Sequence, residues 1–339
     1  MQMKHYIEKC VEGFDLTTDE AAKALDLIMT GQATDAQIAG LLMALRAKGE
    51  TVDEVVGFAQ TMREKSVKVN VGDANAIDMC GTGGDGAGTF NISTVASFVA
   101  AGAGVTVAKH GNKSVSSRSG SADVLSALGV NINLTPEQTG NCIDSIGVGF
   151  MFAPLFHPAM KFAAKPRAEL GVRTIFNIVG PLTNPAGVRR QLLGTYHARA
   201  ATMLAGALQK LHVHKACVVH SDDGLDEVAV SGDTNILEIS EFGEMQSYIV
   251  SPQHFGFELR HLSTVRGGEK EENAAIAMEV LQGHDGAKRE IVVANAAFGI
   301  YVAGKADTIT EAAAKAGESI DSGRALKKFN DFREYSLRA

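Results

Sequence analysis

The stretch DMCGTGGDGAGTFNIST spans residues 78–94 and carries five glycines between Gly81 and Gly88. The short run 76–79 precedes the glycines and an Ala-rich segment, 92–101, follows them, which predicts a strand, a turn and a helix. Backbone N–H groups at such a helix N-terminus bind anions, because the helix dipole is positive there and glycines leave room for a phosphate. A tight turn that needs several positive φ angles is the alternative interpretation. One turn needs fewer glycines, so we expect an anion site.

Two phosphate-binding motifs overlap this loop, and neither fits it completely. Gly81, Gly83 and Gly86 have the G-x-G-x-x-G spacing of dinucleotide-binding folds. Those folds place an acidic residue about 20 positions further on, where it binds a ribose hydroxyl. In this chain the second strand runs instead into Lys109. The spacing of a P-loop is also present, but Thr89 stands where that motif requires Lys.

The residues around the two predicted strand ends suit phosphate oxygens better than a ribose diol. The second strand is followed by KHGNK at 109–113 and by the Ser-rich, cationic stretch SVSSRSGS at 114–121. At the start of the helix, Asn91, Ser93 and Thr94 supply side-chain donors and an oxygen ligand for a metal. The sequence therefore predicts a polyphosphate or sugar-phosphate site rather than a nicotinamide site.

Beyond residue 71 the chain alternates between strand and helix patterns, which predicts an α/β fold with a mainly parallel central sheet. Further strands are expected at 105–108 and 216–219. Helices are expected at 121–129, from Thr135 onward, at 201–211, and as two or three Ala-rich segments in 273–323 around the apolar run 291–293. The proline-rich stretch 154–190 is expected to be irregular, as a crossover that forms a cleft wall or hinge.

The first 65 residues carry the signals of a small helical unit. Capping-box spacing occurs three times, at Thr17-x-x-Glu20, Thr34-x-x-Gln37 and Thr51-x-x-Glu54. Gly31 and Gly49 stand where helix C-caps are expected. Short helices cannot bury their apolar stripes alone, so these must pack on one another or on a partner. We expect a helical domain over 1–70, joined by part of 165–190, and an α/β domain over 71–339.

Composition excludes several classes of protein. The formal net charge of −7 argues against a general binder of nucleic acid or of anionic membranes. No apolar run approaches the length of a membrane-spanning helix, and the start lacks the apolar core of a signal peptide. The four cysteines are far apart and lack C-x-x-C spacing, which indicates reduced thiols in a cytoplasmic protein.

A second cluster, HSDDGLDE at 220–227, directly follows the predicted strand 216–219. It places four carboxylates at the carboxyl end of a strand, where open α/β sheets bind ligands. Mg²⁺ takes one or two carboxylates and bridges to substrate phosphates. A solvated acidic turn around Asp223 and Gly224 is the alternative. Because a phosphate-bound metal needs carboxylates, the glycine loop favours the metal interpretation.

A third candidate is the segment KPRAELGVRTIFN at 165–177, which carries Arg167 and Arg173. An arginine holds a planar carboxylate through two parallel hydrogen bonds. An ion pair at the surface or between domains explains the same residues, and the local sequence leaves both interpretations open.

Several motifs, in order along most of the chain, resemble the anthranilate phosphoribosyltransferase family. They are GTGGDG at 81–86, NIST at 91–94, KHGN at 109–112, SGSAD at 119–123, GVRTIFNIVGPLTNP at 171–185 and DGLDE at 223–227. The resemblance implies a fold like that of nucleoside phosphorylases and phosphoribosyltransferases, usually as a homodimer, with the helical domain at the interface. It implies transfer of phosphoribose from phosphoribosyl pyrophosphate (PRPP) to the amine of anthranilate, the second step of tryptophan synthesis from chorismate.

The resemblance also implies roles for residues that match the family's motifs. PRPP would be bound by Gly81, Gly84, Asp85, Thr89, Asn91, Ile92, Ser93, Thr94, Lys109, His110, Gly111, Asn112, Lys113, Ser114, Val115, Ser116, Ser117 and Ser121. Mg²⁺ would be held by Ser93, Asp226 and Glu227, and anthranilate by Gly81, Asn112 and Arg167. No nucleophile–base pair is evident; His110 could orient the amine or accept its proton, or it could simply shape the site.

Three rival functions were compared with this one. A pyrimidine nucleoside phosphorylase would use inorganic phosphate without a metal, so DGLDE and Arg167 count against it. A nucleic-acid-binding relative without activity would need a basic groove and an eroded glycine loop, which the net charge and the intact GTGGD disfavour. A dinucleotide oxidoreductase is disfavoured by Lys109.

Overall fold

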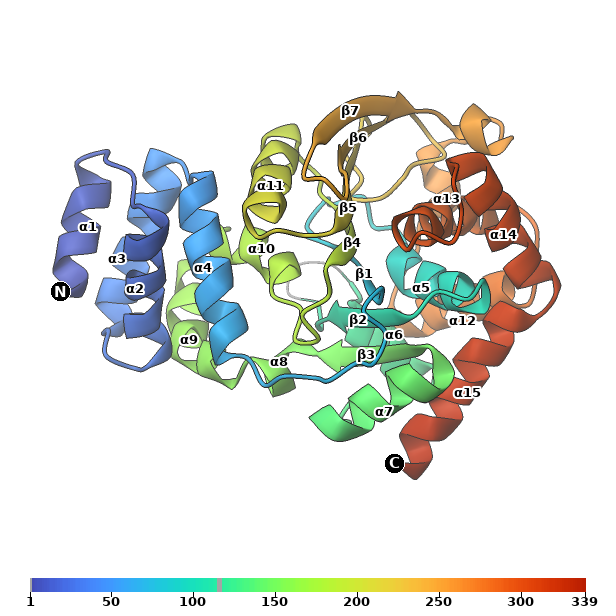
Figure 1. Ribbon diagram of the computed structural model, residues 1–339, viewed down its shortest axis with the longest axis horizontal. Helices are drawn as coiled ribbons and strands as arrows, with labels where there is room; N and C mark the ends of the chain where they lie inside the picture. Colours follow the sequence, from blue (N-terminus) through green and yellow to red (C-terminus); the bar gives the residue numbers. More distant parts are fainter. Residues whose placement is uncertain (1, 115–117) are drawn as a thin grey trace.

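The computed structural model describes residues 2–114 and 118–339. Val115, Ser116 and Ser117, which the resemblance assigned to PRPP binding, lie outside the described residues. A bundle of four helices forms one end of the molecule, and a sheet with helices on both faces forms the rest (Figure 1). The bundle comprises α1 (Met3–Val11), α2 (Thr18–Met29), α3 (Asp35–Lys48) and α4 (Val52–Lys65).

The caps predicted for the bundle are confirmed. Thr17, Thr34 and Thr51 are the N-caps of α2, α3 and α4, and each forms a reciprocal capping box with the residue three positions later. Gly31 and Gly49 follow their helices with φ angles of +72° and +92°. These boundaries follow from local hydrogen bonding of the first turn, which is why sequence spacing alone predicted them.

The central sheet is mainly parallel, as predicted. In the described residues it has seven strands in the order β3-β2-β1-β4-β5-β6-β7, and the first five of these run parallel to one another. The strands are β1 (Ile77–Gly81), β2 (Val107–Gly111), β3 (Val148–Phe152), β4 (Arg190–Gly194), β5 (Lys215–Ser221), β6 (Thr234–Ile239) and β7 (Met245–Val250). The antiparallel hairpin β6–β7 was not predicted, and it extends one edge of the sheet.

The predicted helices of the α/β part are present. Their bounds are α5 (Ile92–Gly102), α6 (Ser121–Ala127), α7 (Pro136–Ile146), α11 (Ala198–Lys210), α12 (Lys270–Leu281), α13 (Ala287–Val302) and α14 (Ile309–Asp321). A further helix, α15 (Arg324–Arg338), was not predicted. The apolar run 291–293 lies inside α13, which is buried along most of its length. None of the described helices combines the length and apolarity needed to cross a membrane.

The prediction of an irregular stretch over 154–190 is wrong for much of its length. It contains α8 (Ala153–Phe156), α9 (Lys161–Leu170) and α10 (Ile175–Val179), with 3-10 turns at Pro158–Met160 and Gly180–Leu182. Pro154, Pro158 and Pro181 occupy first-turn positions, where a missing N–H costs nothing. Of the prolines in this described stretch, Pro166 alone lies in the interior of a helix, α9, beyond its first turn. Prolines that begin helices were therefore read as prolines that break them.

Two hydrophobic cores cover the two faces of the sheet. Alternate residues of β4 face opposite cores: Leu192 packs with α5 and α12–α15, whereas Leu193 packs with the other core. That second core runs without a break from the sheet through α11, α10 and α9 into the four-helix bundle. Because α9 and α10 also pack on α3 and α4, the bundle holds the segment of Arg167 and Arg173 against the sheet.

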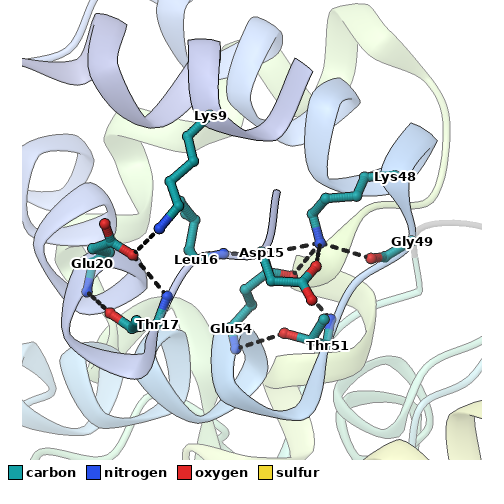
Figure 2. A network of polar contacts seen from close by, with 9 residues as sticks. All are labelled: Lys9, Asp15, Leu16, Thr17, Glu20, Lys48, Gly49, Thr51 and Glu54. Atoms are coloured by element: carbon teal, nitrogen blue, oxygen red, sulfur yellow. Dashed lines mark hydrogen bonds and ion pairs between the residues drawn. The ribbon is translucent and has the colours of Figure 1, made fainter. Parts of the chain in front are cut away.

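A buried ion pair ties the bundle together (Figure 2). The Glu54 side chain is fully buried, and its carboxylate lies 3.0 Å from Lys48 Nζ, whose side chain is 5% exposed. Glu54 also accepts hydrogen bonds from the backbone N–H groups of Leu16 and Thr51, each at 2.9 Å. One carboxylate therefore caps α4, fixes the turn before α2 and neutralises a lysine at the end of α3.

Candidate active site

The predicted site residues gather at the carboxyl ends of the parallel strands. The glycine loop follows β1, residues 109–112 include the end of β2, and the acidic stretch 222–227 follows β5. β1, β2, β4 and β5 run parallel in one sheet, so their carboxyl ends lie along the same edge. This edge is where open α/β sheets bind ligands.

The glycine loop has the backbone that its sequence required, and it also makes room for an acid. Gly83, Gly84, Gly86 and Gly88 all have positive φ angles, between +65° and +80°. A Cβ atom on Gly81 would lie only 2.4 Å from Asp226 Oδ2. The backbone N–H of Gly83 donates to the same oxygen at 2.8 Å. The glycines thus serve both the turn and the close approach of the acidic stretch.

The structure divides the four carboxylates of 222–227 into two pairs. Asp222 accepts a hydrogen bond from Asn235 Nδ2 at 2.9 Å, and Asp223 accepts from the hydroxyls of Ser221 and Ser231, so these two hold the local turn. Asp226 instead faces the glycine loop. The turn interpretation therefore fits Asp222 and Asp223, whereas Asp226 is free of the turn and lies against the glycine loop.

Glu227 reaches the N-terminus of α5, where its Oε1 accepts from the backbone N–H of Ser93 at 3.2 Å. Burial raises the pKa of Asp226 to about 6, and the nearby Asp85 carboxylate adds to the rise. Burial and the Asp226 charge raise the pKa of Glu227 well above its ordinary value. Burial also raises the pKa of Asp85, whose Oδ2 is buried and lacks a hydrogen-bond partner among the described residues. Crowded carboxylates of this kind favour a bound cation.

The protein does not supply a complete metal-binding shell here. No group of three or more His, Cys, Asp or Glu side chains is arranged to hold a metal in the part of the chain that the structure describes. Mg²⁺ keeps several waters and uses one or two carboxylates together with substrate phosphates. The pair Asp226 and Glu227 fits this kind of shared site.

Lys109 is buried beneath the glycine loop at 4% exposure. Its Nζ donates to the backbone carbonyl of Met79 and lies 3.3 Å from Ser93 Oγ. Its positive charge lowers the pKa of Asp226 and of Glu227, although burial outweighs this effect. Lys109 is therefore the internal counter-charge of the acidic pair.

The loop after β2 is joined to the glycine loop by side-chain hydrogen bonds. Asn91 Nδ2 donates to the Ser119 carbonyl at 3.1 Å, and Ser121 Oγ donates to the Asn112 carbonyl at 3.2 Å. A Cβ atom on Gly111 would lie 2.2 Å from Ser121 Oγ, so that position has no room for a side chain. These contacts bring the predicted PRPP residues of both loops together.

The remaining predicted residues around the loops differ in exposure. Thr89 forms a bridge with Arg266, and Ser114 N–H donates to Asp123 Oδ2 at 3.0 Å. Ile92 and Thr94 are buried at 1% and 2% exposure, so only their backbones are placed to meet a ligand. Lys113 remains exposed, with Nζ 5.8 Å from the centre of the Phe152 ring.

His110 has a neighbour that the sequence analysis missed. Its ring lies 5.1 Å from that of His157, and both side chains are buried. Burial lowers the pKa of His110 to about 3 and that of His157 to about 4, so both rings are neutral at pH 7. The position of His157 shortly after the end of β3, at the same sheet edge, is the signal that could have revealed it.

Arg167 has a half-buried guanidinium 4.9 Å from the centre of the Phe176 ring. Burial lowers the pKa of Arg167 below its ordinary value. Within residues 2–114 and 118–339 neither Arg167 nor Arg173 forms an ion pair, which disfavours the ion-pair interpretation of both. Arg173 instead contacts the glycine loop, donating from Nη2 to the Gly84 carbonyl at 2.6 Å.

Comparison with known proteins defines the class. Residues 73–326 match the glycosyl transferase family, a/b domain, and residues 4–66 match the glycosyl transferase family, helical bundle domain. The anthranilate phosphoribosyltransferase of Pelotomaculum thermopropionicum is 50% identical over 334 residues, which cover 98% of this chain and 96% of that protein. The fold and the site thus define a glycosyltransferase with a helical bundle and an α/β domain.

Solved structures agree. The anthranilate phosphoribosyltransferase of Thermus thermophilus superposes with a TM-score of 0.93 at 40% identity, covering 98% of this chain and 99% of that one. The Saccharomyces cerevisiae enzyme, solved in complex with PRPP and Mg, gives 0.92 at 28% identity, covering 99% and 98%. The chain belongs to the anthranilate phosphoribosyltransferase family. It is an enzyme of tryptophan biosynthesis that transfers the phosphoribosyl group of PRPP to the amine of anthranilate. This assignment excludes the three rival functions.

Proposed function

We propose that this reaction takes place at the carboxyl edge of the sheet, between the glycine loop and the segment that carries Arg167. The observation that carries the proposal is the junction of two distant segments. Gly83 and Ser93 of the phosphate-type loop donate backbone hydrogen bonds to Asp226 and Glu227, more than 130 residues away. A phosphate-binding turn and a pair of buried acids are therefore parts of one site.

PRPP is proposed to bind across the glycine loop, the N-terminus of α5 and the loop after β2. The N–H groups of the loop and the positive end of the helix dipole suit a pyrophosphate. Asn91, which joins the two loops, and Asn112 and Ser121, which are hydrogen-bonded to each other within the loop after β2, would carry the ribose and its phosphate. Lys109 contributes positive charge from below the loop.

Mg²⁺ is proposed as the cofactor, held by Asp226, Glu227 and Ser93. The buried carboxylates with raised pKa values are the support for this assignment. When bound, Mg²⁺ would offset charge on the pyrophosphate leaving group. The S. cerevisiae relative, solved with PRPP and Mg, supports the same choice.

The chain's own residues act chiefly by position and charge. The ribosyl carbon becomes oxocarbenium-like as pyrophosphate leaves, and backbone N–H groups and Lys109 stabilise the charge on that group. The anthranilate amine is neutral at pH 7, so it needs no strong base. His110, whose pKa of about 3 keeps it neutral, is proposed to orient the amine through its unpaired Nε2 rather than to take its proton in the ground state.

Arg167 is proposed to bind the carboxylate of anthranilate, with Gly81 and Asn112 nearby in the same site. Replacing Arg167 by Ala should raise the KM for anthranilate about tenfold to a hundredfold, because a charge-assisted pair of hydrogen bonds is lost. The KM for PRPP should change less than about twofold. Arg167→Lys, which keeps the charge without the planar fork, should recover only part of the loss. Equal effects on both substrates would contradict the assignment.

The direct test of the function follows the fluorescence of anthranilate. In a mixture of the protein, anthranilate, PRPP and Mg²⁺ the fluorescence should fall, and omission of PRPP or of Mg²⁺ should prevent the fall. A constant signal, together with phosphorolysis of thymidine in a parallel reaction, would instead favour a nucleoside phosphorylase.

The domain and assembly assignments are also proposals. A helical domain over 1–70, with part of 165–190, is supported by the packing of α9 and α10 on α3 and α4. A homodimer through this domain is supported by Val11 and Phe14, which are 71% and 60% exposed at the end of α1.

The four cysteines are all free, which supports a cytoplasmic setting.

A further inference from the structure

Arg173 has no role in the function proposed above, yet two different elements hold its side chain. Its Nη2 donates to the carbonyl oxygen of Gly84 in the glycine loop at 2.6 Å. Its guanidinium carbon also lies 4.2 Å from the centre of the Tyr196 ring, which follows the end of β4. Arg173 itself stands six residues after Arg167, just beyond the end of α9. One exposed side chain therefore links three segments of the site.

The bond to Gly84 fixes more than one carbonyl group. The peptide bond between Gly84 and Asp85 is planar and trans, so its C=O and the N–H of Asp85 point in opposite directions. Because Arg173 holds the Gly84 carbonyl oxygen on its own side of the loop, the N–H of Asp85 points to the opposite side of the loop. Gly83 and Gly84 have φ angles of +65° and +80°, and glycine changes such angles at little cost. This peptide therefore needs an outside contact to keep a single orientation.

The chemistry of arginine suits this task. A planar guanidinium can stack on an aromatic ring and donate an in-plane hydrogen bond at the same time, whereas the ammonium of lysine cannot. Gly84 is also shaped for the contact, because a Cβ atom there would lie 3.2 Å from Arg173 Nη2. No salt bridge joins Arg173 to a carboxylate in the described part of the chain, but its positive charge acts on the Asp85 carboxylate of the same loop and lowers the pKa of that group. Both the hydrogen bond and the charge of Arg173 are therefore directed at the glycine loop.

We infer that Arg173 is a positioning residue that holds the Gly84–Asp85 peptide in the orientation in which the glycine loop binds PRPP. It thereby connects the anthranilate side of the site, which carries Arg167, to the PRPP side. The inference rests on the proposed function of the loop as the PRPP site.

Two measurements on Arg173→Ala test it. The KM for PRPP should rise about tenfold, the cost of one charge-assisted hydrogen bond, while the KM for anthranilate changes less than about twofold. In the substrate-free protein, backbone amides of residues 83–88 should exchange hydrogen faster than in the unaltered chain. Arg173→Lys should share both defects. Arg333→Ala is the matched control, because Arg333 also lies over a ring, that of Phe329 at 5.5 Å, and should leave both measurements unchanged.

Two results would overturn the inference. One is an Arg173→Ala variant with unchanged amide exchange and an unchanged KM for PRPP. The other is full recovery by Arg173→Lys, which would mean that charge alone matters and orientation does not. If the unaltered chain fails to use PRPP, the proposed function fails. Amide exchange in the substrate-free protein still decides whether Arg173 orders the loop.

Discussion

Replacing Asp226 by Asn and Glu227 by Gln together should reduce turnover at least about a thousandfold at saturating Mg²⁺, the largest effect expected for this protein. The substitutions keep the shape of both side chains and remove the two charges that are proposed to hold the metal. Steady-state rates across a range of Mg²⁺ concentrations measure the effect. Retained Mg²⁺-dependent turnover would mean that the metal binds elsewhere.

The same double variant should be more stable than the unaltered chain when Mg²⁺ is absent. Folding raises the pKa of Asp226 from 3.8 to about 6 and shifts Glu227 in the same direction. An acid whose pKa is raised on folding stabilises the folded state at pH values below its pKa in the unfolded chain. This stabilisation is lost as the pH rises through its pKa in the folded chain. The double variant should therefore melt at a higher temperature than the unaltered chain at pH 8. Below about pH 4 the difference should vanish, and a lower melting temperature at pH 8 would contradict this account.

Replacing Glu54 by Ala should destabilise the protein by about 3–5 kcal/mol, the second large effect. The change leaves Lys48, whose side chain is 5% exposed, with the largely exposed Asp15 at 2.7 Å as its remaining acidic partner among the described residues. It also leaves the N–H groups of Leu16 and Thr51 without their acceptor. The free energy of unfolding from urea denaturation measures the loss. Replacing Glu54 by Leu and Lys48 by Met together should recover part of it, since no buried charge is left without a partner and Asp15, which loses Lys48, is 63% exposed. The N–H groups of Leu16 and Thr51 still lack their acceptor, so recovery should be incomplete.

Glu20 provides the control for that experiment. It occupies the same capping-box position in α2, accepts from Thr17 N–H at 2.9 Å and pairs with Lys9 at 2.6 Å. Its side chain is 24% exposed, however, whereas that of Glu54 is buried. Glu20→Ala should therefore cost only about 1 kcal/mol. Equal losses for the two variants would contradict the role assigned to burial (Figure 2).

Much of the fold could be predicted from the sequence, because its signals act over a few residues. The capping boxes at Thr17, Thr34 and Thr51 and the strand–loop–helix unit at 77–102 appear where the spacing predicted them. Prediction failed where the signal was ambiguous. Prolines in first-turn positions carry the same sequence signal as prolines that break a helix, so the stretch 154–190 was wrongly predicted to be irregular. The strands β3, β4, β6 and β7 were not predicted either, because their pairing depends on contacts between distant segments.

The candidate site was predicted in part. The glycine loop and the acidic stretch were predicted from residue types that suit phosphates and a metal, whereas Arg167 was assigned by the family resemblance. His157 was missed, because nothing near it in the sequence shows that its ring packs 5.1 Å from that of His110. The residue pattern alone did not separate the four carboxylates of the acidic stretch, and Asp226 and Glu227 were assigned to the metal by the family resemblance.

The sequence by itself determined the α/β class, the helix boundaries of the bundle and the glycine-rich turn between β1 and α5. Each depends on contacts between residues only a few positions apart. Tertiary structure alone decided that Gly81 makes room for Asp226, that Arg173 holds Gly84 and that Glu54 neutralises Lys48. The first two join positions far apart in the chain, and the third depends on burial that packing creates. Local spacing encodes neither such distant contacts nor burial.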